Sequence, residues 1–402
     1  MAEKKKKAKK WIQPQHKIVV PILRFLLKPI IQWMYGLEVE KFRQENGRQY
    51  LVLANHQTGF DQFFPSLVFK QHLYYVASED IFSMGWVSRA IQWIANPIPI
   101  KKQVTDIRAV MNCMKVAKEG GSIAMFPEGN RTFSGETGAM NPAIGGLAKK
   151  LGLPIAFLKI EGGYGVQPRW SDVRRKGKMR AYVSTVLEPE EFKTWSNEEL
   201  YQCICKELYQ NEANSEGRFY HKKSAEFLER VLYICPHCGI THFESHGDTV
   251  TCTSCGKQAK YLPSKEFSGD FPFRYMLDWY HYQEDYINGL DTLTLVDEPI
   301  IRDTCSLYKV NLYEGKECLA QQVELALYGD RIEMTGGFAK TFPFAQLDTI
   351  TILGKNKLDI YYEDVVYQIQ SDKRFNALKY LNLFHRYKNL TAQTKDNRFL
   401  GL

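Results

Sequence analysis

A histidine and an aspartate stand at the end of a short apolar segment. The segment is Tyr50–Ala54, typical of a buried strand, and His56 and Asp61 follow it at once. Side chains just past a strand end lie where α/β folds place their active sites. If a helical turn begins between the two residues, the carboxylate can return to one imidazole nitrogen and leave the other free to remove a proton. The spacing therefore predicts a charge-paired general base, although the same pair also occurs as a purely structural contact.

A second strand end carries an acidic residue, a glycine and an arginine. The segment Gly121–Phe126 is again short and apolar, and Glu128, Gly129 and Arg131 follow it. Glycine permits a tight turn and close backbone approach, and the planar guanidinium suits a phosphate. Glu128 would steady that arginine or a substrate hydroxyl. The alternative is a turn with a surface arginine, but both strand ends in one chain favour a site.

These residues resemble the motifs of the glycerolipid acyltransferase family, especially lysophosphatidic acid (1-acyl-glycerol-3-phosphate) acyltransferases. That family carries N-H-x4-D and F-P-E-G-x-R, and both are complete here, in the family's order, as Asn55–Asp61 and Phe126–Arg131. The likeness runs from about residue 37 to about residue 210. It implies transfer of a fatty acyl group from acyl-CoA or acyl-carrier protein to the free hydroxyl of a lysophospholipid, first of all lysophosphatidic acid, which would give phosphatidic acid.

The resemblance also implies roles for the motif residues. His56 is the general base and Asp61 orients it, while Glu128, Gly129 and Arg131 belong to the phosphate-binding acceptor site. Between the two motifs the family has an arginine that contacts the acceptor phosphate; here Lys102 is the best match, which keeps the charge but loses the bidentate fork. Departures of this kind leave the chemistry intact and open a second expectation, an acyltransferase that acts on another lysolipid.

Four cysteines have the spacing of a metal site. Cys235, Cys238, Cys252 and Cys255 form C-x2-C-x13-C-x2-C, which predicts two tight knuckles joined by a short β-ribbon and a Zn2+ ion held by four thiolates. Such zinc is structural, because a catalytic site keeps an open position. The stretch 239–251 has no lysine or arginine, so we expect no nucleic-acid partner.

The elements that must position these residues predict an α/β acyltransferase core, with a mixed sheet flanked by helices, followed by a four-cysteine zinc ribbon and a C-terminal, mainly-β domain like a pleckstrin-homology module. That last domain is predicted from seven short β runs and a final helix at about 373–387. The predicted parts are 1–36, a basic tail and membrane-interfacial segment; 37–228, the acyltransferase domain; 229–262, the zinc ribbon; 263–300, a helical linker; 301–391, the β-rich domain; and 392–402, a tail.

The net charge of +8 is confined to the front of the chain. Residues 1–36 hold nine basic side chains and one acidic one, so the remainder is neutral. On a helix over residues 17–36, Lys17, Arg24, Lys28 and Gln32 would form one polar stripe, with apolar residues elsewhere and Pro21 and Pro29 kinking or breaking it. This pattern predicts an element lying on an anionic membrane surface, peripheral or monotopic, on the cytoplasmic face. The alternatives are a helix packed on the core behind a solvated tail, and a single kinked span.

Composition excludes several classes of protein. With 44% hydrophobic and 24% charged residues, the 402-residue chain is neither disordered nor collagen-like, and a mean hydropathy of −0.36 excludes a multi-spanning membrane protein. One other function class stays open, a non-catalytic adaptor that binds lipid or protein on an acyltransferase core. Intact His56, Asp61, Glu128 and Arg131 favour the enzyme.

Overall fold

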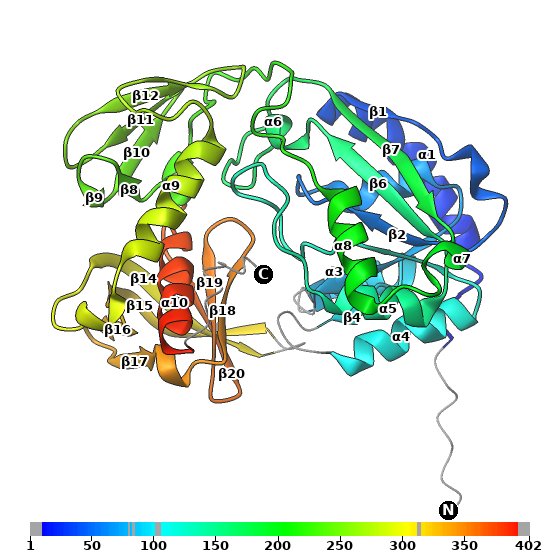
Figure 1. The fold of residues 1–402 in the computed structure, drawn as a ribbon. Helices are drawn as coiled ribbons and strands as arrows, with labels where there is room; N and C mark the ends of the chain where they lie inside the picture. Colours follow the sequence, from blue (N-terminus) through cyan, green and yellow to red (C-terminus); the bar gives the residue numbers. More distant parts are fainter. Residues whose placement is uncertain (1–9, 79–80, 83–84, 101–105, 312–314, 393–402) are drawn as a thin grey trace, which may run out of the picture.

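A mixed seven-stranded sheet forms the N-terminal half of the protein (Figure 1). The computed structural model describes residues 10–78, 81–82, 85–100, 106–311 and 315–392. The strands lie in the order β1-β7-β6-β2-β5-β3-β4, and only β6 and β7 pair antiparallel. Their bounds are β1 (Leu37–Val39), β2 (Leu51–Ala54), β3 (Leu73–Ser78), β4 (Ile98–Ile100), β5 (Ser122–Met125), β6 (Ile155–Glu161) and β7 (Met179–Leu187).

The two strands that precede the motifs are neighbours at the centre of the sheet. All four residues of β2 and all four of β5 are buried, which explains their continuous apolar sequence. The strands run parallel, with Leu53 opposite Met125, so their carboxyl ends meet at the same edge. The loops that begin with His56 and Glu128 are therefore brought together by strand pairing alone.

Helices cover both faces of this sheet. They are α2 (Phe64–Val68), α3 (Trp86–Ile94), α4 (Ile107–Lys118), α5 (Ala143–Leu151), α6 (Gly163–Val166), α7 (Pro189–Phe192) and α8 (Asn197–Leu208), with short 3-10 turns η1 (Arg43–Glu45) and η2 (Asp61–Phe63). Ser196 begins α8 through a capping box with Glu199. Gly145 lets α5 approach α8 closely, because a Cβ atom there would lie 2.2 Å from the main-chain oxygen of Asn197.

The N-terminal helix α1 (His16–Tyr35) differs from expectation in two ways. It runs unbroken through Pro21 and Pro29. Arg24 of its polar stripe also turns inward, where it donates to the main-chain oxygens of Lys70 (2.6 Å) and Gln71 (3.2 Å), whereas Lys17 of the same stripe is exposed. Most of the large side chains that point away from the protein are apolar, among them Ile18, Ile22, Phe25, Leu26, Ile30 and Trp33. By length and composition the helix is apolar enough to cross a membrane, and 11% of its most apolar window is buried.

The C-terminal half contains the cysteine region and a second sheet. Around the cysteines lie β8 (Ile234–Cys235), β9 (Gly239–Ile240), β10 (Phe243–His246), β11 (Thr249–Cys252), β12 (Gln258–Tyr261) and β13 (Phe267–Gly269), after η4 (Leu228–Arg230). Helix α9 (Met276–Gly289) follows, within the predicted helical linker, and η5 (Thr292–Thr294) leads into the second sheet.

This second sheet is antiparallel, curled and seven-stranded, in the order β17-β16-β15-β14-β20-β19-β18. Its elements are β14 (Ile301–Asn311), β15 (Gly315–Leu327), β16 (Arg331–Thr335), β17 (Lys340–Pro343), η6 (Phe344–Gln346), β18 (Thr349–Leu353), β19 (Lys357–Tyr362), β20 (Val365–Gln370) and α10 (Leu378–Thr391). The mixed sheet, the four-cysteine region and this curled β-sheet confirm the predicted fold class.

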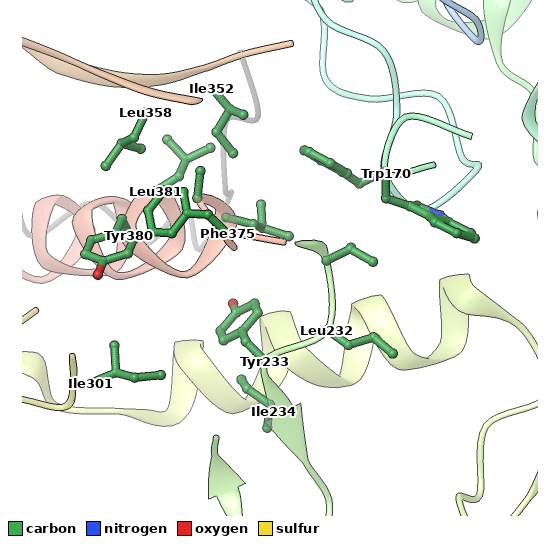
Figure 2. Close-up of a cluster of buried hydrophobic side chains, with 14 of the residues drawn as sticks. Trp170, Leu232, Tyr233, Ile234, Ile301, Ile352, Leu358, Phe375, Tyr380 and Leu381 are labelled. Carbon is green, nitrogen blue, oxygen red and sulfur yellow. The ribbon is translucent and has the colours of Figure 1, made fainter. Parts of the chain in front are cut away.

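One hydrophobic core joins the parts of the C-terminal half. Figure 2 shows Tyr233 beside α9, Tyr380 on α10, and Trp170, which comes from the loop before β7 of the first sheet. All three side chains are buried. The ion pair of Arg230 with Asp172 (2.9 Å) adds a polar tie between the same segments. The second sheet and α10 are thus packed against the loops of the first sheet.

Candidate active site

The loop that carries His56 is fixed to the sheet by its neighbour Asn55. This buried side chain donates to the main-chain oxygen of Ile160 (2.9 Å) and accepts from the N–H of the same residue (2.8 Å). Through these two bonds the Asn55 side chain extends the hydrogen-bonded pairing of β2 and β6 past the end of β2. Gln57 accepts from the N–H of Tyr164 (2.8 Å), which fixes the loop at a second point.

Asp61 holds the imidazole of His56. The 3-10 turn η2 begins at Asp61, and its Oδ2 lies 2.9 Å from His56 Nδ1. The same carboxylate accepts from the N–H groups of Gln57 and Thr58 and from the Thr58 hydroxyl. Asp61 is fully buried. A carboxylate held in place by this many donors orients the imidazole and fixes the tautomer with a proton on Nδ1.

His56 is left as a neutral base. Its ring stacks on Phe126 with centroids 4.6 Å apart, and burial lowers its pKa below the ordinary 6.5, against the opposing effect of Asp61. Nε2 forms no hydrogen bond with any residue that the structure describes, and His56 lines a large cavity. The arrangement can remove a proton from a group that enters this cavity.

Glu128 connects the two strand ends through the backbone. Its carboxylate accepts from the N–H of His56 (2.7 Å) and from the N–H of Gly138 (3.0 Å). Burial raises the pKa of Glu128 to about 8. In this structure its contacts are to main-chain amides next to the base, so it positions His56.

Arg131 has no polar partner among the residues that the structure describes. Gly129 adopts φ +68°, a left-handed conformation that turns the chain toward His56. The guanidinium of Arg131 reaches the His56 loop, since its Nη1 would lie 3.8 Å from a Cβ atom on Gly59. Across the described ranges it forms no hydrogen bond or ion pair, and burial lowers its pKa. A desolvated, unpaired guanidinium beside a base is an anion-binding group.

Arg169 is a site residue that the sequence did not reveal. It begins the basic segment 169–180, yet its side chain is buried, with 5% exposed. It donates to the main-chain oxygens of Arg131 (2.9 Å), Ile352 (2.9 Å) and Gly354 (2.8 Å). Arg169 therefore ties the Arg131 loop to the β18–β19 turn of the C-terminal sheet.

A large apolar cavity opens at His56. Its volume is about 960 Å3, and aliphatic side chains of α1, α2, α3 and α5 line it, among them Leu27, Ile31, Leu67, Ile91, Ile94 and Leu147. Arg131 and Phe126 also line this cavity. A hydrocarbon chain fits a cavity of this kind. Lys102 lies outside the described residues.

The four cysteines converge at the other end of the molecule. The sulfur atoms of Cys235, Cys238, Cys252 and Cys255 all lie within 4.8 Å of one another, with Cys235 and Cys255 3.8 Å apart. Tetrahedral coordination with Zn–S bonds of about 2.3 Å requires sulfur–sulfur distances of about 3.8 Å. The cluster can therefore hold a metal ion, and the four thiolates leave no open position for catalysis.

Comparison with known proteins bears on residues 37–160. This segment, which holds the strands β1–β5, nearly all of β6, and the His56 and Arg131 loops, matches the family model described as Acyltransferase. A chloroplastic 1-acyl-sn-glycerol-3-phosphate acyltransferase of Brassica napus is 24% identical over 136 residues, 33% of this chain and 39% of that protein. One of Arabidopsis thaliana is 22% identical over 136 residues, 33% and 38% of the two chains.

This chain spans well under half the length of these curated relatives. Among solved structures, the 1-acyl-sn-glycerophosphate acyltransferase PlsC from Thermotoga maritima is similar at 23% sequence identity and a TM-score of 0.40, over 48% of this chain and 78% of that chain.

Proposed function

We propose that this protein transfers a fatty acyl group from a thioester donor, acyl-CoA or acyl-carrier protein, to the free hydroxyl of a lysophospholipid. His56 Nε2 removes the hydroxyl proton as the oxygen attacks the thioester carbonyl. The tetrahedral intermediate collapses with cleavage of the C–S bond, and the proton returns from His56 to the departing thiolate. No covalent enzyme intermediate is needed, and no reactant other than the thioester donor and the lysophospholipid takes part.

One observation carries the proposal: a neutral, carboxylate-held imidazole stands beside an unpaired guanidinium at the mouth of an apolar cavity. Acyl transfer between lipids needs these three things together, namely a base for the hydroxyl, a cation for the acceptor phosphate and an apolar space for a chain. Lysophosphatidic acid is the first acceptor to test, because both curated relatives are named as acyltransferases of 1-acyl-sn-glycerol-3-phosphate.

The apolar outward face of α1 supports a location at a membrane surface. Phe25 is 80% exposed and Trp33 is 86% exposed, so neither contributes to the packed core. We propose that this face enters the surface of an anionic, cytoplasm-facing leaflet. Phe25→Gln with Trp33→Gln should weaken binding to vesicles of phosphatidylglycerol and phosphatidylcholine by about 30–1000-fold, since each of the two buried aromatics contributes on the order of 1–2 kcal/mol. Unchanged sedimentation with vesicles would contradict this location.

The cysteine cluster is proposed as a structural Zn2+ site. The ion would be held by Cys235, Cys238, Cys252 and Cys255 and would stabilise the short strands β8–β12. Metal analysis should find about one zinc per chain. Cys252→Ser should lose the metal and lower the melting temperature, whereas Cys318→Ser, at an exposed cysteine outside the cluster, should leave both unchanged.

A turnover assay tests the acyltransferase directly. Lysolipid acceptors are offered with acyl-CoA and with acyl-carrier protein, and His56→Ala is measured beside His246→Ala, an exposed histidine on β10. We expect His56→Ala to lower kcat by about 10²–10⁴-fold, the range for loss of a general base. His246→Ala should match the wild type. Equal turnover in both variants would refute the proposal, and lipid binding without any turnover would favour the adaptor.

A further inference from the structure

A second cavity shares Arg131 and Arg169 with the apolar one. Its volume is about 190 Å3. One wall is the loop 128–139, and the other comes from the C-terminal half, through Tyr280 and Glu284 of α9, Asn382 and His385 of α10, and Ile352 of β18. Helices α9 and α10 lie side by side (Figure 1). The acyltransferase domain thus supplies only part of the space around Arg131.

Polar groups without partners line this cavity. His385 Nε2 is buried and forms no hydrogen bond. Asn382 is 2% exposed and donates its amide N–H to the Tyr233 hydroxyl, while its Oδ1 accepts no hydrogen bond from the described residues. Within the described part of the chain the Tyr280 hydroxyl and the Glu284 carboxylate also form no hydrogen bond or ion pair. Buried polar groups are nearly always satisfied in folded proteins, so the buried His385 Nε2, together with the half-buried Tyr280 and Glu284 that line the same cavity without partners, points to a polar ligand.

The charges of the cavity are separated. Arg131 and Arg169 are cationic, and no carboxylate pairs with either of them in the parts of the chain that the structure describes. Glu284 is the unpaired acid of the other wall, and burial, with Asp285 and Glu136 nearby, raises its pKa to about 7. Glu136 is already engaged by His281 (3.2 Å) and by the Tyr209 hydroxyl (2.9 Å). A ligand with an anionic and a cationic group would satisfy both walls.

We infer that this cavity receives the headgroup of the acceptor, and that the preferred acceptor is a zwitterionic lysophospholipid, with its phosphate at Arg131 and its amine at Glu284. This inference rests on the proposed function and names the acceptor class more closely. The C-terminal half then selects the acceptor for the acyltransferase domain. An acceptor that ends at the phosphate leaves Glu284, Tyr280 and His385 unpaired and gains nothing from them.

Kinetics on matched acceptors provide the test. Lysophosphatidylethanolamine, lysophosphatidylglycerol and lysophosphatidic acid with one acyl chain are compared in the wild type, in Glu284→Gln and in Glu298→Gln. Glu298 is the matched control, an exposed glutamate of the same half that does not line the cavity. We expect Glu284→Gln to lower kcat/KM for the ethanolamine lipid by about 10–100-fold, the loss of one charge-assisted hydrogen bond, with the glycerol lipid within about twofold.

A binding measurement separates this inference from the acyl-transfer proposal. Phosphoethanolamine, which has no hydrocarbon chain, is titrated calorimetrically into the full chain. Binding by the wild type that weakens in Glu284→Gln and persists in Glu298→Gln supports the headgroup site, even if no acyl transfer occurs. Equal binding by all three proteins, or a preference for lysophosphatidic acid that Glu284→Gln does not alter, would overturn the inference while leaving the acyltransferase standing.

Discussion

The two sides of His56 are built in opposite ways. On the base side, the Asp61 carboxylate accepts four hydrogen bonds, all from the loop that it closes. On the acceptor side, the guanidinium of Arg131 donates to none of the described residues, although burial desolvates it too. Groups that are satisfied by the protein hold geometry, whereas desolvated groups left unsatisfied have partners that arrive from outside. The comparison assigns positioning to one side and binding to the other.

The largest effect is expected where the hydrogen bonds are complete. Asp61→Asn would replace a carboxylate that only accepts hydrogen bonds by an amide that also carries donors. Its NH2 group would face the N–H donors of Gln57, Thr58 and His56, so the imidazole would no longer be held in one tautomer and one orientation. We expect kcat to fall by about 10²–10⁴-fold with little change in acceptor KM.

Asp248→Asn, at an exposed carboxylate of the cysteine region, serves as the control and should retain wild-type turnover. A rise in acceptor KM without loss of kcat in Asp61→Asn would place Asp61 on the binding side and break the comparison.

Glu128 lies between the two sides of His56, and its ionisation should affect the free energy of unfolding. Its folded pKa of about 8 lies above the unfolded value of 4.5. Below pH 4.5 the carboxyl is protonated in both states and has no effect. As the pH rises from 4.5 through 8, the unfolded chain ionises more readily, so the free energy of unfolding of the wild type falls relative to Glu128→Gln, by on the order of 3 kcal/mol. Chemical denaturation of both proteins at pH 5 and pH 8.5 measures this difference, and a gap that does not change with pH would contradict it.

The acceptor side should respond through binding. Arg131→Ala removes the unpaired cation, and we expect the acceptor KM to rise by about 10–100-fold while kcat changes far less. Arg131→Lys should recover part of the loss, because it restores the charge without the fork. A fall in kcat at unchanged KM would show that Arg131 acts on the reaction step. Both sides of His56 would then serve catalysis and neither would serve binding alone.

Sequence alone predicted the parts of the site that depend on local chemistry. His56 and Glu128 follow apolar strands, and parallel pairing of those strands brings the two loops together. Arg169 and Glu284 could not be found in this way, because tertiary packing places them. Arg169 lies in a loop that packs against the β18–β19 turn, and Glu284 lies on helix α9 of the C-terminal half. The inward contact of Arg24 on α1 could not be found for the same reason, because its partners, the main-chain oxygens of Lys70 and Gln71, lie far along the chain.

The smallest expected effect tests whether the two sides influence each other. Burial holds the pKa of His56 below 6.5, and the nearby charges of Arg131 and Arg169 lower it further against Asp61. The base works when neutral, so kcat/KM should rise with pH through a midpoint below 6.5 in the wild type. Arg131→Met removes one cation at similar size, and the midpoint should move upward. Arg218→Met, at an exposed arginine far from the site loops in sequence, should leave the midpoint in place. A midpoint above 6.5 in the wild type would mean that Asp61 outweighs burial, and an unmoved midpoint in Arg131→Met would mean that the acceptor cation binds substrate without tuning the base.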